Sequence, residues 1–160
     1  MRVLVVSDTH GRHANLDRAL SEAGDIDVFI HLGDVEGGED YLNAVIECEK
    51  HIVRGNNDFF SDLPREEEFY LDRYRVFITH GHAYYVSLDP EYIFEEGRAR
   101  KADIIMYGHT HKPFFEQKEG ITLLNPGSIS FPRQEGRKGS YMLIEIADGG
   151  TVTYDQRYLD

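Results

Sequence analysis

The chain has 160 residues, of which 41% are hydrophobic and 29% charged, and its net charge is −12. These values are typical of a single globular domain over residues 1–160. They exclude a membrane span, which needs ~20 apolar residues in succession. The negative charge disfavours nucleic acid as a partner, because proteins that neutralise many phosphates carry a basic face. Cys48 is the only cysteine, so no disulfide forms within the chain and a cytoplasmic location is expected.

The first third of the chain alternates between strand and helix patterns. Apolar runs predict strands at residues 3–6, 28–32 and 52–53. Between them, apolar residues recur at helical spacing over residues 16–23, ending near Gly24, and again over residues 42–46. We expect two crossover helices here, the second of them carrying Cys48.

The middle of the chain continues this alternation. Residues 66–71 and 75–78 form a predicted strand pair, and residues 104–106 form another strand. Between them, Asp89 and Pro90 are a typical helix start, with Asp89 as the N-cap, and predict a helix to about Lys101.

From Phe114 onward the pattern changes to short β runs. These runs are separated by Glu119-Gly120 and by Asp148-Gly149-Gly150, which are turn sequences typical of antiparallel strands. The chain therefore has the elements for two sheets packed face to face with helices outside.

Seven potential metal ligands follow the predicted strands of the first 111 residues. They are Asp8, His10, Asp34, Asn56, His80, His109 and His111. Each lies at the carboxyl end of an apolar run, and ligands in open α/β sheets bind beyond those ends. We expect the five loops to converge on one site although they are far apart in sequence.

Six motifs together resemble those of the calcineurin-like metallophosphoesterases. They are Asp8-Thr9-His10, Gly33-Asp34-Val35, Gly55-Asn56-Asn57-Asp58, Thr79-His80-Gly81-His82, Gly108-His109-Thr110-His111 and Asn125-Pro126-Gly127-Ser128. Their order and spacing match too, and the resemblance covers nearly the whole chain, most closely the compact bacterial and archaeal phosphodiesterases. It implies an α/β fold, a four-layer α/β/β/α sandwich of two mixed β-sheets flanked by helices.

The resemblance also implies a centre for two divalent metal ions. One ion would be held by Asp8, His10 and His111, the other by Asn56, His80 and His109, with Asp34 bridging both. Imidazole, carboxylate and amide ligands suit Mn, Fe, Co, Ni or Zn, and the absence of thiolates argues against a closed structural zinc site. Because neutral imidazoles bind metal, binding is expected to weaken in acid.

The chemistry implied by such a centre is hydrolysis of a small phosphate-ester substrate. Two metals ~3.5–4 Å apart lower the pKa of a shared water to about 7 and stabilise both the attacking and the leaving oxygen. A metal-bound hydroxide is then the nucleophile, so no serine or cysteine nucleophile is required.

Three further residues have expected roles near the reacting phosphate. Asn57 stands where many relatives carry a histidine proposed to protonate the leaving group. Loss of such an acid lowers the rate of hydrolysis by a factor of ~100 to 10,000 when the leaving group is poor. We therefore expect diesters or activated esters rather than monoesters. His82 is a candidate to assist by donating to a phosphoryl oxygen or the leaving group, and Arg133 to grip a substrate phosphate.

Structural interpretations stay open for several of these residues. Asn56 alone is more often a turn former than a ligand, and His82 is equally well read as a histidine hydrogen-bonded within its loop. His31 either supports Asp34 or merely packs. Phe59 and Phe60 flank a candidate ligand and either line a substrate groove or form core or subunit contacts.

Two other functions also stay open. A non-catalytic interaction scaffold is the first, because the fold resembles a vesicle-sorting subunit in which the metal motifs are eroded; here all seven ligand positions are filled. A metal-dependent protein phosphatase or nuclease is the second, and the short loops and acidic balance argue against it. The physiological substrate, the native metal and the presence of a homo-oligomer do not follow from the sequence.

Overall fold

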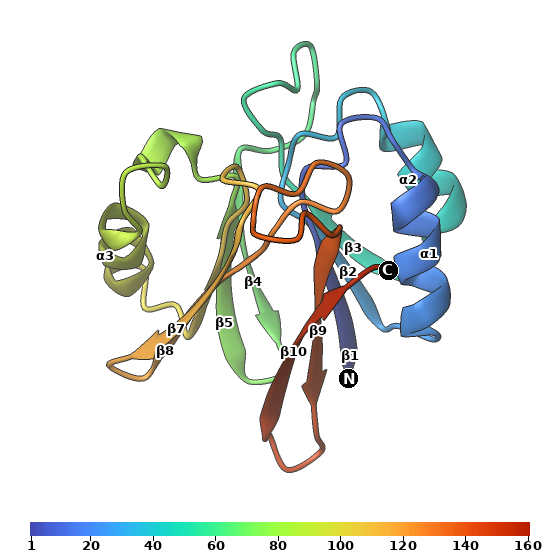
Figure 1. Cartoon of the computed structure of the whole chain (residues 1–160). Coiled ribbons are helices and arrows are strands. Elements are labelled where there is room, and N and C mark those ends of the chain that lie inside the picture. Colours follow the sequence, from blue (N-terminus) through green and yellow to red (C-terminus); the bar gives the residue numbers. More distant parts are fainter.

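The computed structural model describes residues 1–160 and contains two five-stranded β-sheets and three α-helices (Figure 1). The strands are β1 (Arg2–Val6), β2 (Val28–His31), β3 (Glu49–Ile52), β4 (Glu66–Leu71), β5 (Tyr74–Thr79), β6 (Ile104–Met106), β7 (Pro113–Lys118), β8 (Ile121–Pro126), β9 (Ser140–Ile146) and β10 (Val152–Tyr158). The helices are α1 (Ala14–Ala23), α2 (Glu39–Val45) and α3 (Glu91–Ala99), with a 3-10 turn at His82–Tyr84. None of these helices is long and apolar enough to span a membrane.

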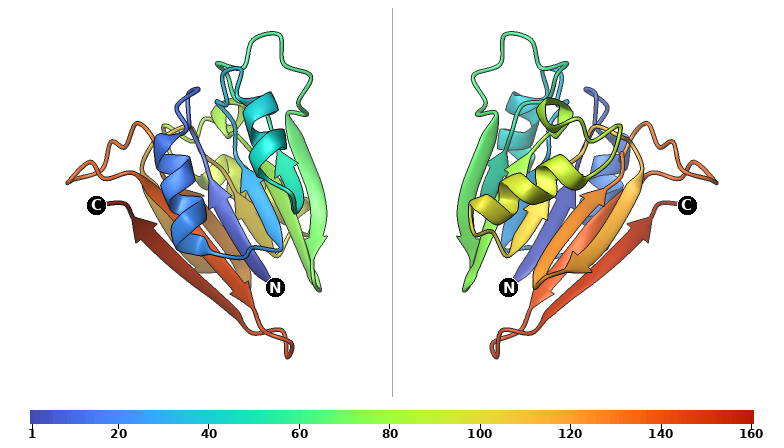
Figure 2. Two further views of the ribbon diagram at one scale, coloured as in Figure 1. Left: turned by 90° about the vertical axis from the view of Figure 1, so that its right-hand side faces the viewer. Right: turned by 90° about the vertical axis from the view of Figure 1, so that its left-hand side faces the viewer.

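The two sheets pack face to face and the helices cover their outer faces, α1 and α2 on one side and α3 on the other (Figures 1 and 2). Strand order is β10-β9-β1-β2-β3 in the first sheet and β4-β5-β6-β8-β7 in the second. Each sheet mixes parallel and antiparallel pairs: β1 is parallel to β2 and antiparallel to β9, and β6 is parallel to β5. The expected four-layer α/β/β/α sandwich of two mixed sheets is confirmed.

Strand β1 shows why the apolar runs are continuous rather than alternating. Val3 and Val5 lie in the core between the two sheets, whereas Leu4 and Val6 pack against the layer of α1 and α2. Because both faces of the strand are buried, every position favours an apolar residue. Burial of each such side chain contributes about 1.5–3 kcal/mol, and the core between the sheets holds 15 buried residues.

Two helix expectations were wrong in detail. Helix α2 ends at Val45, so Cys48 lies outside it, because only three residues remain before β3 begins and the chain is already extended at Ile46. Helix α3 ends at Ala99, since Lys101 has a left-handed φ of 60° that turns the chain toward β6.

The start of α3 also differs from the expectation. Its N-cap position is Pro90 rather than Asp89. The Asp89 side chain still satisfies the helix start from one position earlier, because its Oδ1 accepts a hydrogen bond of 2.8 Å from the Glu91 N–H.

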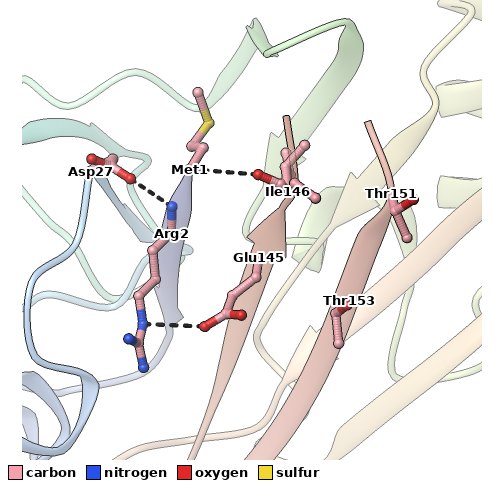
Figure 3. A pocket seen from close by; sticks show the side chains of 8 residues that line it. Met1, Arg2, Asp27, Glu145, Ile146, Thr151 and Thr153 are labelled. Carbon is pink, nitrogen blue, oxygen red and sulfur yellow. Dashed lines mark hydrogen bonds and ion pairs between the residues drawn. The ribbon is translucent and has the colours of Figure 1, made fainter. Parts of the chain in front are cut away.

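The parallel strands direct their carboxyl ends to one edge of the sandwich, where the long loops gather (Figure 1). The opposite end of β1 is a hollow of about 280 Å³ in which charged groups pair with one another (Figure 3). There the Arg2 N–H donates to Asp27 Oδ2 at 2.7 Å, and Arg2 Nε lies 3.6 Å from Glu145 Oε1. The candidate site lies at the edge with the long loops, because the carboxyl ends of the parallel strands meet there.

Candidate metal centre

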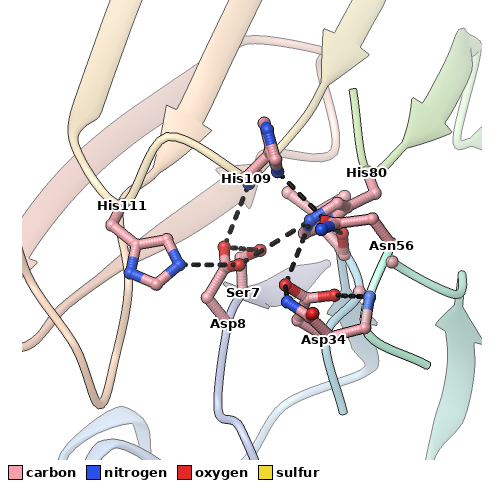
Figure 4. Close-up of polar contacts among 12 residues, drawn as sticks. Ser7, Asp8, Asp34, Asn56, His80, His109 and His111 are labelled. Atoms are coloured by element: carbon pink, nitrogen blue, oxygen red, sulfur yellow. Dashed lines mark hydrogen bonds and ion pairs between the residues drawn. The ribbon is translucent and has the colours of Figure 1, made fainter. Parts of the chain in front are cut away.

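The loops after β1, β2, β3, β5 and β6 bring all seven predicted ligands together, and all of them except His10 are labelled in Figure 4. Three of these strands belong to the first sheet and two to the second, so the site lies across the gap between the sheets. Four of the seven, Asp8, His10, Asp34 and His111, offer ligand atoms that all lie within 4.8 Å of one another.

Two carboxylates form the middle of the cluster. Asp8 Oδ1 lies 3.2 Å from His111 Nε2 and 3.7 Å from His10 Nε2. Asp34 Oδ2 lies 3.7 Å from His10 Nε2 on one side and 3.4 Å from His80 Nε2 on the other. Asp34 therefore stands between the two groups of predicted ligands.

Asn56 and His109 complete the second group. Asn56 Oδ1 lies 3.1 Å from His109 Nδ1, and the His109 ring centroid is 5.1 Å from that of His80. The backbone N–H of His109 donates to Asp8 Oδ2 at 3.1 Å, which ties the two groups together.

Hydrogen bonds outside the cluster fix the orientation of three histidines. The Nδ1–H groups of His10, His80 and His111 donate to Glu36 Oε1 at 2.9 Å, Leu32 O at 2.6 Å and Phe131 O at 2.7 Å. In each ring this leaves the Nε2 lone pair directed into the cluster. Histidines that bind metals in proteins are commonly held in this way by an acceptor on the other nitrogen.

The inner atoms lack partners among the protein's own groups. Asp8 Oδ1 and His80 Nε2 are buried and make no hydrogen bond, and the Nε2 atoms of His10 and His111 lie 3.2 Å apart. Leaving buried acceptors unpaired costs about 1–3 kcal/mol each, and two facing lone pairs repel unless a positive charge lies between them. The residues present therefore fit a divalent cation.

Charge at the centre is strongly polarised. Burial alone raises the pKa of Asp8, but the neighbouring His10 and His111 rings, when doubly protonated, hold that pKa well below its ordinary value. Burial likewise opposes ionisation of Asp34, yet a doubly protonated His80 ring beside it lowers its pKa to about 2. The Asp8 carboxylate in turn raises the pKa of His10 to about 9, so that without a metal ion a proton takes the place of the cation on that ring. Both carboxylates are thus anionic at neutral pH and available to a cation.

The ligand loops have unusual backbone conformations. Five of the predicted ligands have left-handed φ values: Asp8 at 56°, His10 at 49°, Asp34 at 59°, His109 at 68° and His111 at 59°. Residues other than glycine adopt this region at a cost, and such strain concentrates at functional sites. These backbone conformations therefore cost folding stability, and they direct the ligand side chains inward.

Two motif glycines explain how the loops approach so closely. A Cβ on Gly55 would overlap Asp34 Oδ1, and a Cβ on Gly108 would overlap Ser7 Oγ and lie 2.9 Å from Asp8 Oδ2. Glycine before a ligand is therefore a packing requirement at these positions.

Asp58 is a functional residue that the sequence interpretation missed. It is buried, and its carboxylate accepts backbone N–H hydrogen bonds from Asp34 at 2.8 Å, Glu36 at 2.6 Å and Gly55 at 2.7 Å. It thereby joins the loop after β2 to the loop after β3. The residue was visible in its motif, but nothing local shows that two of its three partners, Asp34 and Glu36, lie more than 20 positions away.

Asn125, near the end of β8, and Ser128, in the loop after it, support the centre. Ser128 Oγ donates to the Asp8 carbonyl at 2.9 Å, and Asn125 Nδ2 donates to the Gly108 carbonyl at 2.9 Å. Ser7, which had no expected role, donates to Asp8 Oδ2 at 2.6 Å. These groups position the ligand loops.

The remaining predicted site residues lie around the opening. Asn57 bonds Asp34 twice, through its N–H to Oδ1 and its Nδ2 to Oδ2, each at 2.9 Å. The His82 ring centroid is 5.5 Å from that of His80, and burial lowers the pKa of His82. Arg133 lines a hollow of about 350 Å³ together with His10 and His111. Asn57 is thus placed to hold Asp34, while His82 and Arg133 lie on two sides of the centre.

His31 forms a neutral support beneath the loops. Its Nδ1 accepts from the Gly33 N–H at 3.1 Å, its Nε2–H is 3.0 Å from Thr9 Oγ1, and burial lowers its pKa to about 4. It therefore contacts residues beside the ligands rather than Asp34 itself.

Comparison with known proteins agrees with this geometry. The family model of the calcineurin-like phosphoesterase superfamily domain matches residues 1–149. The chain is 32% identical over 159 residues to the Bacillus subtilis protein named "Probable metallophosphoesterase YsnB", covering 98% of this chain and 92% of that protein. It is 35% identical, over an alignment of 170 positions, to the Escherichia coli "Phosphodiesterase YfcE", covering 91% of this chain and 88% of that protein.

Solved structures show the same fold. A predicted phosphoesterase from Streptococcus pneumoniae superimposes with a TM-score of 0.80 at 26% identity, covering 98% of this chain and 97% of that chain. Vps29 from Entamoeba histolytica, in complex with zinc, superimposes with a TM-score of 0.77 at 26% identity, covering 99% of both chains.

Proposed function

The chain belongs to the calcineurin-like phosphoesterase superfamily, and we propose that it is a phosphodiesterase that depends on two divalent metal ions. The observation that carries this proposal is the set of inward Nε2 atoms around Asp8 and Asp34 whose outer nitrogens are already bonded. A protein that needed these residues only for stability would pair their inner atoms with each other or with backbone groups.

The ligand set divides naturally between two ions. Asp8, His10 and His111 would hold the first, and Asn56, His80 and His109 the second, with Asp34 shared. When bound, such a pair supplies an acidified water as nucleophile and neutralises charge building on phosphorus. Mn, Ni, Fe, Co and Zn all suit these donors.

The residues of the chain have separate tasks in this proposal. Asp34 would keep the two halves of the centre in fixed relation, and Asn57 holds its carboxylate from behind through two hydrogen bonds. His82 at the opening would donate a hydrogen bond to a phosphoryl oxygen or the leaving group. Arg133, beside His10, would contact a substrate oxygen from the other side.

Diesters and activated esters are the favoured substrates. An alkyl monoester needs a strong acid at its leaving oxygen, and Asn57, which stands at the relevant position, has an amide already engaged by Asp34. Leaving groups that depart without protonation avoid this requirement.

Hydrolysis of bis(4-nitrophenyl) phosphate with added manganese or nickel tests the proposal. Asp8→Ala and His109→Ala are expected to abolish turnover. After removal of metal by a chelator, both variants are expected to keep the circular dichroism spectrum of the metal-free wild type. His51→Ala is the matched control, because His51 lies in β3 and pairs with Glu49 and Glu67. Full activity in either ligand variant would remove the assignment.

A scaffold function is the alternative, because Vps29 shares the fold over nearly its whole length. Zinc in that Vps29 structure means that metal content alone does not separate the two functions. Turnover does: a protein that binds metal stoichiometrically but hydrolyses none of a panel of activated mono- and diesters would favour the scaffold.

A further inference from the structure

A pocket of about 390 Å³ opens beside the candidate metal centre and carries two arginines. Its lining residues are Arg54, Gly55, Asn56, Asp58, Phe59, Phe60, Arg65 and His82. Asn56 and His82 also belong to the centre described above, so the pocket is continuous with it. A group bound here would be part of the same molecule whose phosphate reacts.

Neither of the two arginines forms an ion pair. Arg75 and Arg100, by contrast, are paired with Glu68 and Glu66, with N···O distances of 3.0 and 2.6 Å. The chain has 29 acidic and 17 basic residues, yet only six of its twelve arginines form an ion pair with a carboxylate. Two unpaired guanidinium groups in one pocket of such an acidic protein leave a local excess of positive charge.

The one carboxylate that lines the pocket does not neutralise this charge. Asp58 is buried, and both of its oxygens accept hydrogen bonds from backbone N–H groups. Its negative charge is therefore already compensated where it lies, and the arginine side chains remain available to an incoming anion.

The loop that carries the pocket is held in place at its base. The Arg54 N–H donates to the Pro64 carbonyl at 2.8 Å, and Arg54 Nη1 donates to the Ser61 carbonyl at 3.2 Å. The loop projects beyond the sheets (Figure 1), and Phe59 and Phe60 are 74% and 104% exposed. The pocket thus combines positive charge, anchored at Arg54, with an apolar rim.

We propose that this pocket binds a second anionic group of the substrate, a terminal phosphate or carboxylate on one arm of the diester. The inference rests on the proposed function, because it names the class of ester that the same centre hydrolyses. Arginine presents paired N–H donors that match the oxygens of both groups, whereas a neutral arm would gain only contact with Phe59 and Phe60.

The test uses three esters that all release 4-nitrophenolate. They are 4-nitrophenyl phenyl phosphate and the same ester with a carboxylate or a phosphonate at the para position of the phenyl ring. With manganese, the wild type is expected to have kcat/KM about tenfold higher for the anionic esters, a ratio equivalent to one charge-assisted hydrogen bond. Comparison of the two anionic esters distinguishes carboxylate from phosphate-type recognition.

Arg65→Gln is expected to remove this preference through KM and to leave the neutral ester unchanged within twofold. Arg137→Gln is the matched control, since Arg137 is exposed, makes no ion pair and does not line the pocket. Arg65 is exposed, so its substitution preserves the fold.

Two results would overturn the inference while leaving the proposed function intact. One is equal kcat/KM for all three esters in the wild type. The other is an equal loss for all three in Arg65→Gln, which would place the arginines on the reacting phosphoryl group. Absence of metal-dependent 4-nitrophenolate release from every ester would instead contradict the proposed function, and this inference with it.

Discussion

His10 Nε2 and His111 Nε2 lie 3.2 Å apart although the two residues are 101 positions apart in sequence. Each ring donates its Nδ1–H outward, to Glu36 and to the Phe131 carbonyl, so the two lone pairs face one another beside Asp8. With both rings neutral this contact is unfavourable, and a cation that joins the two nitrogens makes it favourable. Metal binding is therefore expected to stabilise the folded protein.

His111→Ala is expected to remove most of that stabilisation. At a metal concentration 100 times the Kd, the wild type gains about 2.7 kcal/mol in free energy of unfolding. Urea denaturation with and without manganese measures this gain in both proteins. His51→Ala serves as control and should keep the full gain; an unchanged gain in His111→Ala would exclude His111 as a ligand.

Glu36→Gln tests the support behind His10. The Glu36 carboxylate accepts the His10 Nδ1–H at 2.9 Å, and loss of such a partner typically weakens metal binding 10- to 100-fold. Metal titration followed by calorimetry checks the affinity. Glu47→Gln, at an exposed glutamate with no partner, should bind metal as the wild type does. Equal affinities for both variants would contradict the role of Glu36.

Asn57→His is expected to narrow the gap between diesters and alkyl monoesters. Restoring an acid at this position should raise turnover of poor leaving groups by about 100-fold, with little effect on 4-nitrophenyl esters. The same substitution removes the Nδ2 hydrogen bond to Asp34, so a moderate loss of metal affinity is expected as well. The ratio of the two kcat/KM values is the measurement, and an unchanged ratio would remove the argument from the missing acid.

Acid is expected to destabilise the chelated protein through His31. Burial lowers the pKa of His31 to about 4, below its ordinary value of 6.5, so the folded state favours the neutral ring. The contribution of the neutral His31 ring to the free energy of unfolding is fully present above about pH 6.5. It is lost as pH falls toward 4, a change on the order of 3 kcal/mol.

Chemical denaturation between pH 7 and 4 tests this expectation. His31→Gln, which does not titrate, should show a shallower loss of unfolding free energy over that window than the wild type. Parallel curves for the wild type and His31→Gln would show that another group carries the acid sensitivity.

Much of the architecture was predictable because it depends on local patterns. The continuous apolar run at β1, the strand at Ile104–Met106 and the turn at Glu119-Gly120 all follow from the burial of both strand faces or from turn chemistry. Helix ends were less accurate: Cys48 lies outside α2, because the distance to the next strand decided where the helix stops.

The sequence by itself determined which side chains stand at the ends of strands, and their order in the chain was sufficient to indicate the family and the seven potential ligands. Only the tertiary structure decided that those ends come from two different sheets, that Asn57 bonds Asp34, and that Asp58 joins two ligand loops. It also decided that Arg54 and Arg65 share a pocket without a carboxylate to pair with. The physical reason is that strand and turn preferences act between near neighbours, whereas the orientation and pairing of a side chain depend on groups that folding brings from distant parts of the chain.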